Sequence, residues 1–377
     1  MRTLIVGAGV AGLTLAAGLA QQGRHTTVVE RFPVASDGYA LGLYPLGSCT
    51  LHGLGAYREL LARGLVLERY ELADYRDRLL QVVDTSVLTG GLGPILMVGR
   101  SRLLEILERA AAGSDLRRQI TVSSLEISDS EVGVRFTDGT DDRFDLVVAC
   151  DGIASAVRQM VFGSASGFDS GWILWTWWTR ADQLPSVAAR EWWGRGWFLG
   201  AYPAPGRIMC AAGGPAAEWD VGGDGSVPGL LSDRLRPLIA RVEWVGRAVT
   251  DASGAYSWRM RDVRARRWSD HRVVLCGDSA VAFLPTAGVG ASSAMRLAAA
   301  LADELSRADA QAVPLALERY EKRCRRIVER NQTDSRRLAH AMFVRNPALA
   351  WLRDQVVRRY PPERALANVV ASAREPF

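Results

Sequence analysis

The sequence predicts an α/β fold in which a Rossmann-like nucleotide-binding domain carries an inserted antiparallel β-sheet domain and C-terminal helices. Three observations predict this fold. A strand, a glycine-rich turn, a helix and a second strand follow one another within residues 3–30. Continuous apolar strands recur at 145–150 and 272–278, of the kind that is buried on both faces of a parallel sheet. Between them, residues 163–265 are rich in Gly, Pro and Trp and contain short strand-like runs.

Local patterns place the other elements in chain order. Strands are predicted at 3–6, at 26–30 and in several runs over 119–149, with a hairpin connection at 138–142. Helices are predicted at 11–22, 101–112 and 290–307. The remainder to Phe377 is mostly helical, with breaks near Asn346-Pro347 and Pro361-Pro362.

These elements divide the chain into three parts. We expect a discontinuous nucleotide-binding domain over 1–70, 97–162 and 270–320. A β-rich substrate domain takes up 71–96 and 163–269, and a helical segment takes up 321–377.

The composition is typical of a globular protein, with 48% hydrophobic and 23% charged residues in 377. No apolar run reaches the ~18 residues that a membrane span needs. The glycine-interrupted start is read as a folded strand and not as a signal peptide. The five cysteines form no C-x-x-C or Cys/His pattern, so we expect no metal site and reduced, buried thiols in a cytoplasmic protein.

The net charge of +5 comes almost entirely from arginine, since Lys322 is the one lysine in the sequence. Much of the excess lies within residues 319–338. No aromatic interleaving or helix-turn-helix pattern accompanies it. We therefore expect a solvated helix face and no nucleic-acid partner.

The first motif is the run Gly7-Ala8-Gly9-Val10-Ala11-Gly12, which follows a strand and opens a helix. Gly7 permits the tight turn, Gly9 allows a pyrophosphate to approach the backbone, and Gly12 allows the helix to pack on the strand. Glu30 ends the next strand, where an acidic residue accepts hydrogen bonds from a ribose. This motif alone leaves NAD and FAD open.

Two further motifs favour FAD. Asp151-Gly152-x-x-Ser155-x-x-Arg158 follows the strand at 145–150, and "GDSAVAFLPTAGVGAS" begins at Gly277 after the next such strand. Together with the glycine motif they resemble the three fingerprints of the class A flavoprotein monooxygenases, the family of para-hydroxybenzoate hydroxylase. The resemblance covers about the first 310 residues. Val281 departs from it, since the family often has histidine at this position.

The resemblance implies a set of FAD-binding residues. Gly7, Gly9, Gly12 and Glu30 would hold the ADP half of FAD, and Ala11 and Arg31 belong to the same cofactor-binding set. Arg100 would approach the ribityl–phosphate region, and Asp278 would bind the ribityl hydroxyls. Asp151 and Arg158 match a motif that the family links to both FAD and the pyridine nucleotide. Pro285, Gly288, Val289 and Gly290 match the turn against the isoalloxazine ring. This turn leads into the helix at 290–307, whose free N–H groups and dipole stabilise negative charge on a reduced flavin.

The resemblance also implies an activity. NAD(P)H would reduce FAD, oxygen would add at flavin C4a to give a hydroperoxide, and one oxygen atom would pass to an electron-rich aromatic, alkene or polyketide-like small molecule. The sequence has no second G-x-G-x-x-G in a strand–helix context, so we expect NAD(P)H to dock transiently on the FAD domain. The arginine-rich composition suggests bacterial secondary metabolism.

Three other functions stay open. A flavin-dependent halogenase has a W-x-W-x-I-P motif and an early lysine, but Trp175-Thr176-Trp177 is followed by Trp178-Thr179, and Lys322 lies late in the chain. A flavin-dependent alkene reductase of the same fold is distinguished by turnover without oxygen. A non-catalytic flavin-binding protein would oxidise no NAD(P)H.

Seven tryptophans fall between positions 172 and 197. On a strand, Trp175 and Trp177 point to one face, and Trp172 and Trp178 point to the other. A sheet with two dry faces suits this pattern, one face packed on the domain body and one turned toward the flavin. We expect at least one of Trp175 and Trp177 to line the substrate cavity.

Overall fold

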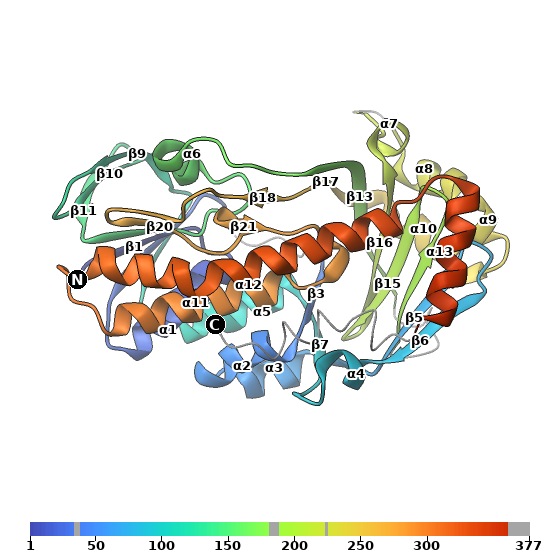
Figure 1. The fold of residues 1–377 in the computed structure, drawn as a ribbon, viewed down its shortest axis with the longest axis horizontal. Coiled ribbons are helices and arrows are strands. Elements are labelled where there is room, and N and C mark those ends of the chain that lie inside the picture. Colours follow the sequence, from blue (N-terminus) through green and yellow to red (C-terminus); the bar gives the residue numbers. More distant parts are fainter. Residues whose placement is uncertain (34–37, 181–187, 223–224, 361–377) are drawn as a thin grey trace.

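The computed structural model describes residues 1–33, 38–180, 188–222 and 225–360. Its two main sheets lie toward opposite ends of an elongated molecule, and one long helix, α12 (Val313–Met342), runs from one end toward the other (Figure 1). The architecture is the α/β fold predicted above.

The first main sheet forms the nucleotide-binding core. Its six strands lie in the order β19-β20-β12-β1-β2-β8, and all pairs are parallel except β19 with β20. In chain order the strands are β1 (Thr3–Val6), β2 (Thr26–Glu30), β8 (Asp115–Arg118), β12 (Leu146–Ala149), β19 (Ser269–Asp270) and β20 (Val273–Leu275). Every residue of β1, β12 and β20 is buried, as the continuous apolar runs predict.

Helices cover this sheet. They are α1 (Val10–Gln21), α5 (Arg100–Ala110) and α11 (Gly290–Ser306), and α1 packs against both of the others. A Cβ atom on Gly18 would lie 3.2 Å from the Cβ of Ala302, so small residues allow α1 and α11 to approach closely. The predicted helices at 11–22, 101–112 and 290–307 agree with these elements to within one or two residues.

Smaller elements surround the core. The three-stranded sheets are β9 (Val122–Ile127), β10 (Val132–Phe136) and β11 (Asp141–Phe144), and then β3 (Ala40–Leu43), β4 (Leu65–Leu67) and β7 (Ile95–Gly99). Short helices are α2 (Pro45–Gly53), α3 (Tyr57–Arg63), α4 (Thr85–Thr89) and α6 (Ala156–Phe162). A ribbon pairs β18 (Val263–Arg264) with β21 (Val281–Ala282).

The second main sheet has seven strands in the order β17-β13-β16-β15-β14-β5-β6. They are β5 (Arg69–Asp74), β6 (Leu79–Asp84), β13 (Asp169–Arg180), β14 (Ala188–Trp193), β15 (Phe198–Ala204), β16 (Arg207–Pro215) and β17 (Tyr256–Arg261). All neighbours are antiparallel except β5 and β14. Two early strands therefore complete a sheet that the later chain builds.

The two faces of this sheet belong to different cores. Its inner face packs against β3, β4, β7 and Leu284. Its outer face is covered by α7 (Ala216–Trp219), α8 (Val227–Arg234), α9 (Arg236–Ile239) and α10 (Glu243–Thr250) (Figure 1). These helices correct the expectation of strands and turns throughout 163–265. The buried residues Leu231, Leu235 and Leu238 recur at helical spacing, which the Gly- and Pro-rich surroundings obscured.

The C-terminal helices tie the two ends together. From α12, the Gln332 amide donates to Val263 and Ala282 carbonyls, and the Ser335 hydroxyl donates to the Leu284 carbonyl. Helix α13 (Pro347–Arg359) begins after Asn346, whose side chain accepts hydrogen bonds from the Ala348 and Leu349 N–H groups. The predicted break there is confirmed, and the one at Pro361-Pro362 lies outside the described residues.

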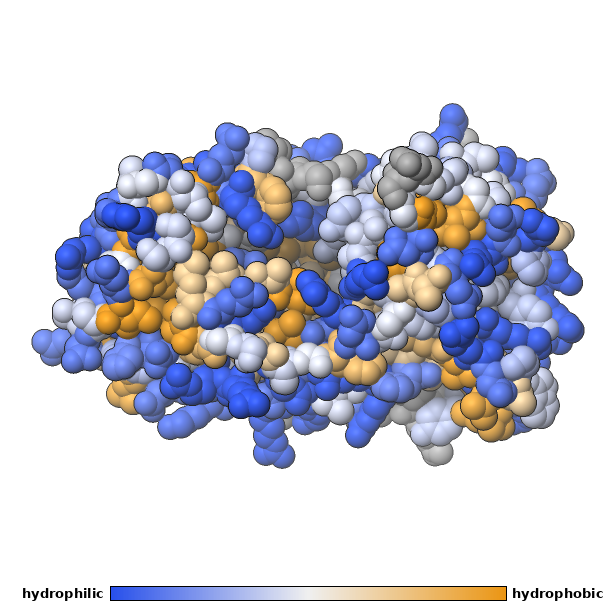
Figure 2. Space-filling view, turned by 90° about the horizontal axis from the view of Figure 1, so that it is seen from above, coloured by the Kyte–Doolittle hydropathy of each residue, from blue (hydrophilic) through white to orange (hydrophobic). Residues whose placement is uncertain are grey.

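Helix α12 is continuous through residue 320, where we expected the nucleotide-binding domain to end. Among the described residues, no helix is both long and apolar enough to cross a membrane. Hydrophilic side chains are spread over the face in Figure 2, with smaller hydrophobic groups between them. All five cysteines are free thiols, and four are buried, whereas Cys49 is exposed, contrary to expectation.

Candidate functional site

The glycine loop between β1 and α1 has the shape that a bound phosphate needs. Gly7 adopts a φ of +108°, and a Cβ atom there would clash with the carbonyl oxygen of Cys150. A Cβ atom on Gly12 would clash with the carbonyl oxygen of Gly7, whereas one on Gly9 would meet no atom within 4 Å. Gly7 and Gly12 are therefore required by packing, and Gly9 leaves open space beside the start of α1.

Glu30 lies beside this loop. Its Oε2 accepts a hydrogen bond from the Ala8 N–H at 2.8 Å, and its Oε1 accepts one from the Phe32 N–H at 3.0 Å. These hydrogen bonds hold the Glu30 carboxylate at the loop. Glu30 is still partly exposed, so a ribose hydroxyl could reach it. Arg31 is exposed, and its guanidinium lies 4.8 Å from the centre of the Phe32 ring.

The second and third motifs meet the first in space. A Cβ atom on Gly277 would lie 2.7 Å from the Cβ of Ala11, so the third motif packs directly on the glycine helix. Arg158 is buried and donates to the carbonyl oxygens of Ser279 at 2.8 Å and Ile153 at 2.7 Å. Burial lowers its pKa, and the charge of Asp151 partly offsets that effect.

Asp151 supplies an orphaned polar atom at this junction. Its Oδ2 accepts a hydrogen bond from the Val157 N–H at 3.1 Å, whereas its buried Oδ1 has no protein partner. A buried carboxylate oxygen without a partner is costly, and a ligand hydroxyl or amide would satisfy it.

Arg100 and Asp278 lie close enough to interact electrostatically, although 177 residues separate them in the sequence. Arg100 opens α5, and its backbone N–H donates to the carbonyl of Tyr39 at 2.9 Å. Asp278 is accessible to solvent yet enclosed by protein on most sides. Loss of hydration raises the pKa of Asp278 to about 6, and the positive charge of Arg100 opposes this rise.

The turn at 285–290 matches the shape expected beside a flat ring. Pro285 begins a short 3-10 helix, Gly288 adopts a φ of +64°, and Val289 precedes α11 without a side-chain cap. The first N–H groups of α11 are therefore open to a ligand. Tyr44 lies beside this turn, with its hydroxyl 3.5 Å from the carbonyl oxygen of Ala287.

These residues fit FAD. The open side of Gly9 and the start of α1 suit a pyrophosphate, and Glu30 suits the adenosine ribose. The unpartnered Oδ1 of Asp151 and the accessible carboxyl of Asp278 suit ligand hydroxyl groups. The uncapped start of α11 suits the electron-rich edge of a flavin.

The structure does not bring Trp175 and Trp177 to this site. Their indole N–H groups donate to the carbonyls of Trp219 at 2.8 Å and Ala248 at 2.7 Å, and both rings are buried in the outer core. The prediction that Trp175 and Trp177 share one face of the strand was correct, but the prediction that this face lines the substrate cavity was not. Trp172 and Trp178 are the pair on the inner face, where the Trp178 indole donates to the Gly38 carbonyl at 2.9 Å.

Trp172 packs against the C-terminal helices, since its ring stacks on Phe343 with centroids 3.9 Å apart. The guanidinium of Arg207 lies 3.7 Å from the centre of the Trp178 ring. Two inner-face tryptophans lie beside the segment that leads into β3, since Trp178 contacts Gly38 and the centroid of the Trp258 ring lies 5.4 Å from that of Tyr39.

A group of residues on the same inner face was missed. Glu191 of β14 is buried and accepts hydrogen bonds from the Tyr202 hydroxyl at 2.5 Å and from the Trp193 indole at 2.9 Å. Burial raises the pKa of Glu191, and hydrogen bonds from Tyr202, Tyr70 and Trp193 oppose the rise. The one signal in the sequence is a carboxylate on an otherwise apolar strand.

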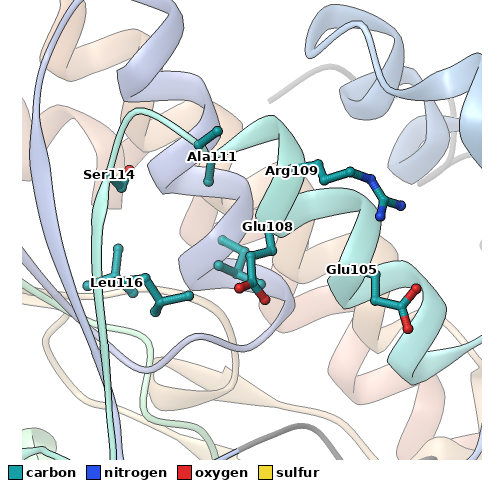
Figure 3. A pocket seen from close by; sticks show the side chains of 9 residues that line it. Glu105, Glu108, Arg109, Ala111, Ser114 and Leu116 are labelled. Carbon is teal, nitrogen blue, oxygen red and sulfur yellow. The ribbon is translucent and has the colours of Figure 1, made fainter.

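Two surface pockets lie near α5. One of about 510 Å³ is formed by α1, α5 and β8, and Figure 3 shows Glu105, Glu108 and Leu116 around it. It contains none of the predicted site residues. A second, of about 640 Å³, lies beside the start of α5, with Ser101, Arg102 and Arg207 in its wall. Within the described ranges, no three His, Cys, Asp or Glu side chains are grouped as metal ligands would be.

Comparison with known proteins agrees with this geometry. A family model described as an FAD binding domain matches residues 1–335. The chain is 30% identical over 337 residues to a 3-amino-4-hydroxybenzoate 2-monooxygenase of Streptomyces platensis, covering 85% of this chain and 83% of that protein. It is 26% identical to the aurachin C monooxygenase/isomerase of Stigmatella aurantiaca, covering 98% and 96%.

The fold is also similar to those of solved flavoprotein structures. HpxO of Klebsiella pneumoniae, solved with FAD and uric acid, superimposes with a TM-score of 0.87 at 22% identity, covering 99% of this chain and 96% of that one. The predicted α/β fold and the FAD cofactor are thereby confirmed. The chain belongs to the FAD-binding-domain family, and within it to the flavin-dependent monooxygenases.

Proposed function

We propose that this monooxygenase hydroxylates an electron-rich aromatic small molecule, using O₂ and NAD(P)H, in bacterial secondary metabolism. The observation that carries the proposal is the inner face of the seven-stranded sheet. Its tryptophan and tyrosine side chains pack in the same core as Leu284, which directly precedes the turn at 285–290. The names of the Streptomyces and Stigmatella relatives support an aromatic substrate of the aminohydroxybenzoate or quinoline kind.

We assign FAD-binding roles to the residues that the three motifs bring together. Gly9 and the start of α1 hold the pyrophosphate, and Glu30 holds the adenosine ribose. Asp278 holds the ribityl chain beside Arg100. The start of α11 lies against the ring.

Bound FAD supplies the chemistry that activates oxygen. The protein contributes a dry and shaped site. Apolar residues of the inner core, including Leu174, Met260 and Leu284, exclude water from the region between the sheet and the turn. The tyrosine hydroxyls on this face orient a polar aromatic ring by hydrogen bonding.

NAD(P)H use rests on the single dinucleotide motif, since docking on the FAD domain would need no second one. A cytoplasmic location is part of the same proposal. Free thiols, four of them buried, support a reducing compartment.

The test uses the FAD-loaded protein with NADH or NADPH and a panel of aminohydroxybenzoates and hydroxyquinolines. We expect substrate-stimulated oxidation of the nicotinamide, oxygen uptake, and a product heavier by one oxygen atom. Turnover under anaerobic conditions would instead identify an alkene reductase. Incorporation of chloride or bromide would identify a halogenase, and no nicotinamide oxidation with any ligand would identify a non-catalytic flavoprotein.

A further inference from the structure

We propose that Glu191, acting through Tyr202, is the proton acceptor for a ring hydroxyl of the substrate, so that the enzyme selects phenols and hydroxylated N-heteroaromatics that bind as their anions. This inference rests on the proposed function, because it names the substrate class of the same site. It is carried by the position of one buried carboxylate and by the uncharged groups around it.

Glu191 lies on the inner face of the sheet. It shares that face with Ala189 and Trp193 on β14, whereas Trp192 points into the outer core. On the next strand Gly200 stands directly opposite Glu191. The missing side chain at Gly200 lets the Tyr202 ring fold over it, and this fold brings the Tyr202 hydroxyl to the carboxylate.

Among the residues that the structure describes, the donors to this carboxylate are uncharged. Tyr202 donates to Oε1 at 2.5 Å, Trp193 donates to Oε2 at 2.9 Å, and Tyr70 of β5 provides a further hydrogen bond. The Glu191 residue is only 6% exposed. Burying an ionisable group with no cation among its donors costs stability, so a structural role alone explains this arrangement poorly.

The tyrosines connect the carboxylate to the flavin side of the site. Tyr70, Tyr202 and Tyr44 are partly buried, and all three pack against the inner-face core that contains Leu284. The negative charge of Glu191 acts on all three, and with burial it raises the pKa of Tyr44 to about 12. Tyr44 also contacts the turn that precedes α11. A substrate between this turn and the sheet therefore meets tyrosine hydroxyls.

The proton transfer balances without any further reactant. The substrate O–H gives its proton to Tyr202 Oη while the Tyr202 O–H gives its own proton to Glu191 Oε1. The products are a substrate oxyanion and a glutamic acid, and tyrosine is restored. The oxyanion makes the ring positions ortho and para to it more electron-rich, which favours attack by an electrophilic oxygen.

The groups that face Glu191 set its titration. They are Tyr70 from β5, Tyr202 from β15 and Tyr44 from the segment before α2, and each is neutral at physiological pH. Burial raises the pKa of Glu191 above that of an ordinary glutamate. A base is most effective when its pKa approaches the working pH, so the raised pKa makes Glu191 a better proton acceptor.

The test compares hydroxylated probes with their methyl ethers, which cannot give up a proton. The FAD-loaded enzyme is titrated with 3-amino-4-hydroxybenzoate, 4-hydroxyquinoline and the O-methyl ether of each, using tryptophan fluorescence and ultraviolet difference spectra. We expect the better hydroxylated probe to bind at least tenfold more tightly than its ether and to show the spectrum of the anion. Equal binding within both pairs would overturn the proposal.

The variants are Glu191→Gln, which keeps the shape and an acceptor oxygen, and Tyr202→Phe, which breaks the relay while keeping the carboxylate. Both should lose the hydroxyl preference and the anion spectrum. Glu71→Gln is the matched control, since Glu71 lies on the adjacent strand, on the opposite face of the sheet from Glu191, and forms a 3.6 Å ion pair with Arg190. Flavin content and melting temperature show whether each variant is folded.

For oxygenation, the low-pH decline in kcat/KM that reflects protonation of Glu191 should disappear in Glu191→Gln. A Glu191→Gln enzyme with the wild-type pH profile and hydroxyl preference would overturn the proposal. Hydroxyl preference without any oxygenated product would leave the proton acceptor established and refute the proposed function instead.

Discussion

The ring of Tyr202 lies directly over Gly200, so that a Cβ atom at position 200 would lie 2.5 Å from the Tyr202 hydroxyl oxygen. The same hydroxyl donates to Glu191. The glycine therefore determines where the tyrosine can go, and the tyrosine determines what the carboxylate can contact.

Gly200→Ala should displace Tyr202 and break its hydrogen bond to Glu191. We expect a loss of about 1–3 kcal/mol in the free energy of unfolding, because extra volume is forced into a packed site. Binding of hydroxylated probes should weaken, with FAD content unchanged. Denaturant unfolding and fluorescence titration measure these effects. Gly53→Ala is the control, since its added methyl meets no atom within 4 Å; equal effects in both variants would contradict the prediction.

Gly9→Ala and Gly12→Ala should separate ligand contact from packing. The methyl group of Gly9→Ala enters open space, so the flavin-free protein should change in stability by no more than about 0.5 kcal/mol. Its FAD affinity should fall at least about tenfold, the effect of losing a charge-assisted phosphate contact. Gly12→Ala clashes with the Gly7 carbonyl and should destabilise even the flavin-free form.

Thermal unfolding with and without FAD, together with flavin fluorescence titration, distinguishes the two variants. A Gly9→Ala protein with wild-type FAD affinity would place the pyrophosphate away from this loop.

FAD affinity should depend on pH through Asp278. Its pKa is raised to about 6, so the carboxyl is ionised above that pH and protonated below it. An ionised carboxylate is the stronger acceptor for a ribityl hydroxyl. We therefore expect FAD affinity to fall as the pH decreases from about 7 to 5, by up to roughly tenfold. Asp278→Asn should bind more weakly at pH 7 and show a flat profile, and a flat wild-type profile would refute the assignment.

The inner-face and outer-face tryptophans should respond differently to substitution. Trp175→Phe removes the indole donor of the buried Trp219 carbonyl, so it should lower the free energy of unfolding by about 1–3 kcal/mol. Trp177→Phe should cost less, because the Ala248 carbonyl also accepts the Asp251 N–H. Substrate KM should stay close to wild type. Trp178→Phe should change KM more than stability, because Trp178 contacts Gly38 beside the site. A change in KM in Trp175→Phe but not in Trp178→Phe would contradict the assignment of Trp178 to the substrate side.

The nucleotide-binding half of the molecule was predictable because its signals are local. Each motif contains its own strand, turn and helix start, so the sequence around Gly7 and around Asp278 was sufficient to place both. Their meeting in space follows from parallel strands that end at one edge of the sheet.

The substrate half was less predictable because its decisive features are not local. Alternation separates Trp175 from Trp178, but only the packing of α8–α10 decides which of the two faces the flavin side. The contacts of the Glu191 carboxylate likewise depend on Gly200 and Tyr202 on another strand and on Tyr70 on a third. These four residues are too far apart along the chain for a local sequence pattern to reveal that they meet.

Helix α12 contacts both halves through its C-terminal part, from Gln332 onward. Its Gln332 and Ser335 hold the ribbon and the turn at 285–287, while its last turn presents Met342 and Phe343 to the inner face of the sheet. A helix of 30 residues spans about 45 Å at ~1.5 Å per residue. Ser335, which contacts the turn, precedes Met342, which contacts the sheet, by about 10 Å along the helix at ~1.5 Å per residue, so this part of α12 sets the spacing between the turn and the sheet. Adding one residue between Ser335 and Met342 would rotate the contacts with the turn against those with the sheet by about 100°.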